Sequence, residues 1–230
     1  MWQKILHIWR IKQLRNNILF VLAMLVIFRL VAHIPIPGVD VENLRRFFAS
    51  NEILGLLNIF SGGTLENFSV VLMGVAPYIT ASIIFQLLGK VVPRLEEIQK
   101  EGQSGQEKIN MYTRIATVPL AILQGFGMMQ LLQRSQLNIL GSISTFQFMA
   151  ILITISAGTV FLMWIGELVT EKGIGNGISL LIFANIVSAL PKAIQNAIIN
   201  YDSSQFYTYF MFVVVAVITV VGVIFISEGQ

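Results

Sequence analysis

Long apolar runs separated by short polar segments dominate the chain. A helix needs about 20 mainly apolar residues to cross the hydrocarbon core of a membrane. Five runs approach or reach that length, at 17–34, 70–92, 115–132, 146–168 and 206–227. A sixth run, 177–190, is shorter, contains Asn185 and is expected to end at Pro191. Because its neighbours obtain a consistent orientation only if this run also crosses, the pattern predicts six crossings.

Composition supports a lipid environment. Apolar residues make up 55% of the 230 positions and charged residues 12%, which is about half the charged fraction of a soluble domain. The sequence has no cysteine, and its two histidines, His7 and His33, are far apart. These features exclude disulfides and offer no metal-ligand spacing, and no Ser, His and carboxylate assemble into a catalytic set. We therefore expect no enzyme activity, metal or cofactor.

The distribution of basic residues predicts a cytoplasmic N-terminus, because cytoplasmic segments carry the excess of Lys and Arg. In that orientation ten basic residues lie inside: Lys4, Arg10, Lys12, Arg15, Lys90, Arg94, Lys100, Lys108, Arg114 and Lys172. Four lie outside: Arg45, Arg46, Arg134 and Lys192. Residues 1–16 are expected to form an interfacial helix, with a frayed basic tail as the alternative, because four apolar side chains share one helical face: Trp2, Ile5, Leu6 and Trp9.

The second apolar segment, 58–92, is interrupted. Gly62 and Gly63 permit a sharp reversal of the chain, and Gly74 and Pro77 stand near the start of the long apolar run. Backbone polar groups that lose their helical partners at membrane depth must be buried in protein or face a water-filled cavity. The break therefore predicts a cavity, which suits either a channel or a secondary transporter.

Two pairs of branched aliphatic residues stand near Gly-rich breaks. Val75 and Ile79 are four residues apart, as are Ile178 and Ile182, so the members of each pair share a helical face. Two such pairs could meet as a hydrophobic constriction that gates by dewetting. The same spacing is common in helices that simply pack or face lipid, so it does not decide between these interpretations.

Four separated motifs resemble the SecY family, the large subunit of the bacterial Sec translocon. They are IPIPGV at 34–39, NIFSGGTLENFSVVLMGVAPYITASIIFQLL at 58–88, LEEIQKEGQSGQEKINMYTR at 95–114 and FLMWIGELVTEKGIGNGIS at 161–179. The resemblance implies an all-α, polytopic membrane helix bundle. It assigns 17–192 to the first five-helix half of an inverted repeat, with the broken second span at 58–92, and 206–228 to a sixth transmembrane helix.

The resemblance also implies roles for particular residues. Val75, Ile79, Ile178 and Ile182 match the pore ring. Thr80 and Gln124 match polar positions of the lateral gate. The segment of about 53–67 matches the plug, with five positions of interest: Asn58, Phe60, Ser61, Gly62 and Gly63.

A SecY-like function implies a passive conduit for secretory and membrane polypeptides in the bacterial plasma membrane. Its partners would be SecE, SecG, signal sequences, membrane lipid, and the SecA motor and ribosome, whose main docking loops are expected outside this chain. No nucleic-acid recognition is expected. The resemblance leads us to expect a fragment, since four of the family's ten spans are not present. A secondary transporter stays the alternative, and would need a polar cluster at the bilayer midplane.

Two charged regions complete the predictions. Residues 94–114 carry charges of both signs and are expected to form a solvated loop, which is compatible with a docking surface. Glu167 and Glu171 lie near the C-terminus of a predicted helix, where negative charge is unfavourable. We expect a cation such as Arg114 or Lys172 to offset them.

Overall fold

A computed structural model of the chain describes residues 11–50, 61, 64–135, 139–141, 143–173, 175–199 and 206–228. In these ranges the regular structure is helical apart from one isolated β-bridge. The chain divides into two compact units, Met1–Ala189 and Leu190–Gln230. The first unit holds α2 (Lys12–Val31), α3 (Val41–Ala49), α5 (Ala76–Val91), α6 (Pro93–Lys100), α7 (Gln103–Gln133), α8 (Thr145–Glu171) and the first part of α9 (Gly177–Ile199). The second holds the rest of α9 and α10 (Phe206–Glu228).

The described helices confirm an all-α membrane bundle. Four of them are long and apolar enough to cross a membrane, namely α2, α7, α8 and the Phe210–Glu228 part of α10. A fifth span results if α5 and α6, which meet at a bend of 101°, are counted together. The apolar part of α9, Gly177–Pro191, is shorter. The chain is therefore a multi-pass membrane protein.

Several helix boundaries differ from those expected. Helix α9 continues through Pro191 to Ile199, so the prediction that Pro191 ends it is wrong. A proline inside a helix removes one backbone hydrogen bond and tends to kink the helix, but the helix can continue beyond it. The predicted interfacial helix 1–16 overlaps α2, which begins at Lys12, and residues 1–10 lie outside the described ranges.

The charged segment 94–114 is also mostly helical, not a loop. It consists of α6 and the first turns of α7, separated by Gly102, whose φ of +74° suits glycine. Its ion pairs, Lys100–Glu96 and Lys108–Glu101, are exposed. The segment keeps the solvated character that its mixed charges predict.

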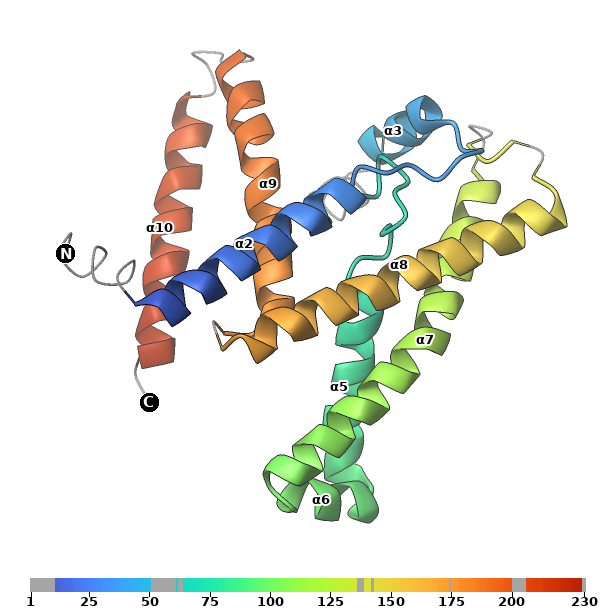
Figure 1. Cartoon of the computed structure of the whole chain (residues 1–230). Helices are drawn as coiled ribbons and strands as arrows, with labels where there is room; N and C mark the ends of the chain where they lie inside the picture. The colour runs from blue at the N-terminus through green and yellow to red at the C-terminus, as the bar shows by residue number, and fades with distance from the viewer. Residues whose placement is uncertain are drawn as a thin grey trace. The chain divides into compact units, whose positions relative to one another are not determined.

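Helices α5, α7 and α8 pack in sequence within the first unit, and α6 lies against the ends of α5 and α7 (Figure 1). Helix α2 runs beside α8. Two apolar clusters form the core. One gathers α3, the turns at 64–75 and the facing ends of α7 and α8. The other gathers α2, α8 and the starts of α5 and α9.

The interrupted segment has a defined backbone structure. Residues 64–75 form successive turns, and α5 begins only at Ala76, with Pro77 in its first turn. Pro35 and Ser69 form an antiparallel bridge, in which Ile36 N donates to the Phe68 carbonyl at 2.9 Å and Val70 N donates to the Ile34 carbonyl at 3.0 Å. These bonds satisfy polar groups that a continuous helix would have paired internally.

Helix α8 packs directly against the same segment. A side chain at Gly158 would overlap the Val70 carbonyl, so the two backbones touch. Small residues allow this approach between membrane segments. Gly74, with φ of +55°, then turns the chain into α5. The described part of the interrupted segment thus consists of irregular turns held by backbone contacts, followed by the short helix α5.

Candidate functional site: the helix starts at the interrupted segments

The start of α5 holds the first aliphatic pair. Val75 occupies the N-cap position of α5, and its carbonyl accepts a hydrogen bond from Ile79 N at 3.0 Å. Pro77 fits the first turn because the backbone N–H that it lacks has no helical partner there. Val75 is buried and Ile79 is half-buried. The helix start therefore stacks both side chains on one side.

The start of α9 holds the second pair and crosses α8 closely. Asn176 caps α9, because its Oδ1 accepts from Ser179 N at 3.1 Å. Gly177 N donates to the Thr170 hydroxyl at 2.8 Å. A Cβ at Gly177 would overlap the Gly166 carbonyl, and one at Gly166 would overlap the side chain of Ile178. Glycine at both positions therefore lets the two helices meet backbone to backbone.

The structure brings both pairs to one apolar cluster. Val75 is a buried member, and Ile79, Ile178 and Ile182 are half-buried against it. The other buried members come from α2, the 64–75 turns, α8 and α9: Val21, Phe28, Ala32, Val71, Leu162, Ile165, Val169 and Leu181. Residues about 100 positions apart in the sequence thus lie together, at the starts of the two helices that follow the Gly-rich breaks.

Most of the predicted plug lies outside the described residues. That applies to Asn58, Phe60, Gly62 and Gly63. Ser61 is described, and it precedes the pinned turns. Its carbonyl accepts from the Thr64 hydroxyl at 3.1 Å, and its hydroxyl accepts from Leu65 N at 3.4 Å. Ser61 therefore stands where the fixed part of the interrupted segment begins.

The two predicted gate residues are hydrogen-bonded to each other. Gln124 Nε2 of α7 donates to Thr80 Oγ1 of α5 at 3.3 Å, and Thr80 Oγ1 donates to the Ala76 carbonyl at 3.0 Å. Both side chains are half-buried. This bond is a polar tie between α5 and α7.

A second polar tie joins α7 to α8. Arg114 Nε of α7 forms an ion pair with Glu167 Oε1 of α8, and the Glu167 side chain is only 18% exposed. The expectation that a cation such as Arg114 or Lys172 offsets Glu167 and Glu171 is confirmed for Glu167, whose partner is Arg114.

Lys172 has a different role, which the sequence analysis missed. Its ammonium lies 5.0 Å from the centre of the Phe20 ring, and its carbonyl accepts from Asn17 Nδ2 at 2.9 Å. These contacts fasten the start of α2 to the end of α8. The only signal in the sequence is an asparagine at the beginning of an apolar run, which does not identify a partner.

The described residues contain no group of three or more His, Cys, Asp or Glu that could hold a metal ion. The candidate site consists instead of apolar side chains at two helix starts, flanked by two interhelical polar ties. Such an arrangement can close, open or line a passage.

The fold and site define a class of helical membrane proteins with broken spans, and comparison with known proteins specifies the family. The SecY family model matches residues 69–230. The chain is 43% identical to the protein translocase subunit SecY of Corynebacterium glutamicum and 42% identical to that of Pseudomonas aeruginosa. These alignments cover 98% and 96% of this chain and 53% and 50% of the relatives. The chain belongs to the SecY family and spans about half the length of these curated relatives.

Proposed function

We propose that this chain forms the first five-helix half of a protein-conducting channel together with one further helix. In this proposal Val75, Ile79, Ile178 and Ile182 belong to a hydrophobic ring around the passage. The observation that supports it most is their convergence on one apolar cluster at the starts of α5 and α9. An apolar ring blocks ions by dewetting and needs no bound ligand.

The proposed transport is passive. The relatives are named protein translocase subunits, and we extend that function to this chain as a conduit for secretory and membrane polypeptides. The energy for movement would come from partners, since a ring of aliphatic side chains performs no chemistry.

We further propose that the segment of about 53–67 is a plug and that α5 and α7 form part of a lateral gate. The Thr80–Gln124 hydrogen bond supports the second assignment, because a gate between two helices needs a contact that is specific yet weak enough to break. A single interhelical hydrogen bond in a membrane contributes about 0.6 kcal/mol. The hydrogen bonds of Ser61 to Thr64 and Leu65 favour the plug assignment, because they would attach a plug to the ordered turns that follow it.

Location and partners follow from the same assignment. We propose a bacterial plasma membrane location with a cytoplasmic N-terminus, supported by the excess of ten basic residues over four. SecE and SecG would complete the membrane complex. SecA and the ribosome would dock mainly outside this chain, with the exposed charged surface of α6 and the first turns of α7 as a contributing contact.

Crosslinking from position 79 tests the proposal. A photo-reactive residue would replace Ile79 in the translocase that contains this chain, and a secretory substrate would be arrested during transit. We expect the substrate to be captured from position 79 but not from Ile84, which is 40% exposed on a different face of α5. Capture from Ile84 alone would contradict the ring assignment.

The secondary transporter would give a different result in the same system. It would take up a small solute when the complex is reconstituted in vesicles, and an arrested polypeptide would be captured at neither position. The channel proposal expects capture at Ile79 and no coupled solute uptake.

A further inference from the structure

The last residues of the proposed plug belong to a buried, hydrogen-bonded turn. Ser69 N donates to the Thr64 carbonyl at 3.2 Å, and Phe68 N donates to the Leu65 carbonyl at 3.2 Å. All four of these side chains are buried. Phe68 has a φ of +44°, which is uncommon for a bulky residue. Contacts around the turn must therefore maintain this backbone conformation.

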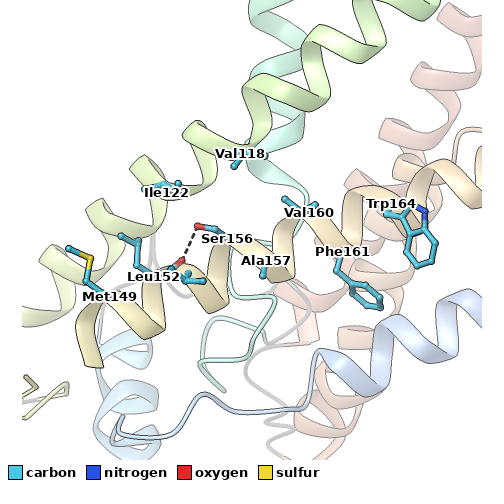
Figure 2. Close-up of a pocket in the computed structure, with 10 residues that line it drawn as sticks. Val118, Ile122, Met149, Leu152, Ser156, Ala157, Val160, Phe161 and Trp164 are labelled. Carbon is cyan, nitrogen blue, oxygen red and sulfur yellow. Dashed lines mark hydrogen bonds between the residues drawn. The ribbon is translucent and has the colours of Figure 1, made fainter. Parts of the chain in front are cut away.

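Two backbone contacts hold the chain from Phe68 onward. The Phe68 carbonyl accepts from Ile36 N at 2.9 Å, and the Val70 carbonyl touches Gly158 of α8. Figure 2 shows this part of the chain passing beside α8 near Ala157. Neither contact involves a residue of the plug segment. The orientation of the plug relative to these fixed turns therefore depends on contacts made before Phe68.

Helix α3 supplies contacts on that side. Its apolar face buries Leu44 in the same cluster as Leu65 and Phe68. From its exposed side, Arg45 Nη2 donates to Asn67 Oδ1 at 3.0 Å. The donor is charged, so this bond is stronger than one between two neutral groups. It joins α3 to a residue 22 positions later in the sequence.

We propose that Arg45 is a positioning residue for the plug, because it holds the Asn67 side chain against α3 and so keeps the plug in its closed orientation. This inference rests on the proposed plug at about 53–67. Asn67 is the last residue of that segment and directly precedes the buried Phe68. The bond therefore acts at the point where the plug joins the fixed turns. Arg45 is exposed, so the bond can break without leaving a buried charge.

Resting ion conductance tests the proposal in planar bilayers that hold the translocase containing this chain. Arg45→Ala and Asn67→Leu each remove the bond and should each raise the conductance about fivefold. Arg46→Ala is the matched control, because Arg46 is the next residue on α3 and pairs with Glu42 of its own helix. Asn67→Asp keeps the acceptor oxygen and should keep the conductance low, which loss of side-chain packing at Asn67 would not explain.

Two further measurements separate positioning from folding. Arg45→Ala and Arg46→Ala should have equal melting temperatures, since both arginines are exposed. The chain has no cysteine, so Ser61→Cys provides a unique thiol at the start of the ordered turns. A membrane-impermeant maleimide should modify this thiol about fivefold faster when Arg45→Ala is also present. Arg46→Ala should leave the rate unchanged.

Deletion of residues 53–60 tests the plug itself and should raise the conductance at least as much as Arg45→Ala does. A leak after the deletion but none after Arg45→Ala would overturn the role of Arg45 and leave the plug standing. No leak after the deletion would overturn the plug and this inference together. Equal leaks from Asn67→Asp and Asn67→Leu, or a lower melting temperature for Arg45→Ala than for Arg46→Ala, would also contradict a positioning role.

Discussion

The side-chain amide of Gln124 donates to the hydroxyl of Thr80 at 3.3 Å, and this bond joins α7 to α5. Thr80 simultaneously donates to the Ala76 carbonyl one turn earlier. The hydroxyl is therefore held in one orientation by its own helix and presents its lone pair to α7.

Removing this tie should weaken the α5–α7 contact modestly. Thr80→Val keeps the shape of the side chain but removes the acceptor, and Gln124→Leu removes the donor. A double-mutant cycle on unfolding in lipid micelles should give a coupling free energy of about 0.6 kcal/mol. Gln130→Leu with Thr80→Val serves as the control pair and should show no coupling. A coupling of zero for Thr80 and Gln124 would mean that the bond does not hold the helices together.

The ion pair between Arg114 and Glu167 should contribute more than a surface pair. Glu167→Gln or Arg114→Gln leaves a partly buried charge without its partner and should each lower the free energy of unfolding by about 2 kcal/mol. The double variant should lose clearly less than the sum of the two. Glu42→Gln is the control, because the Glu42–Arg46 pair is 78% and 67% exposed and should contribute at most about 0.5 kcal/mol. Additive losses in the α7–α8 pair would contradict this account.

Gly158 should not tolerate a side chain. Gly158→Ala places a methyl group against the Val70 carbonyl, so α8 or the 64–75 turns must move, at a cost of about 1–3 kcal/mol. Gly127→Ala is a matched control within α7, because nothing lies within 4 Å of its added Cβ, and it should be neutral or stabilising by about 0.5–1 kcal/mol. Thermal unfolding of both variants tests this prediction. Equal melting temperatures would show that the contact between Gly158 and the Val70 carbonyl leaves room for a methyl group.

The aliphatic pairs should control ion permeability. Replacing both Ile79 and Ile182 by Ser hydrates the proposed ring and should raise the resting ion conductance of a translocase that contains this chain, measured in planar bilayers. Ile84→Ser on the exposed side of α5 should leave conductance unchanged. Unchanged conductance in the double variant would place those two side chains away from the passage.

Much of the fold could be predicted because a membrane makes hydrophobic length informative. Helices α2, α7, α8 and α10 coincide with predicted apolar runs to within a few turns. Glycine and proline also predicted the interruption before α5. They did not predict its backbone geometry, because the hydrogen bonds that replace helical pairing are made with Ile34 and Ile36, far away along the chain.

The candidate site was predictable to a different extent. The spacing of Val75 and Ile79, and of Ile178 and Ile182, was compatible with simple packing, and only the family resemblance favoured a ring. Arg114 was one of two residues expected to form an ion pair with Glu167, because charge alone does not specify which cation lies near it. The contacts of Lys172 with Phe20 and Asn17 depend on the path of α2 beside α8, which no local sequence pattern encodes.

The bridge between Pro35 and Ser69 has a consequence for the order in which the protein folds. Its two residues are synthesised early and lie near each other in the sequence, so the bridge can form while the ribosome is still synthesising α7. Gly158, on which Val70 rests, is added much later. Until α8 is made, the contacts available to the irregular segment are its own bridge and its packing against α3. Early pairing would therefore give the nascent chain a partial structure that contact with α8 completes.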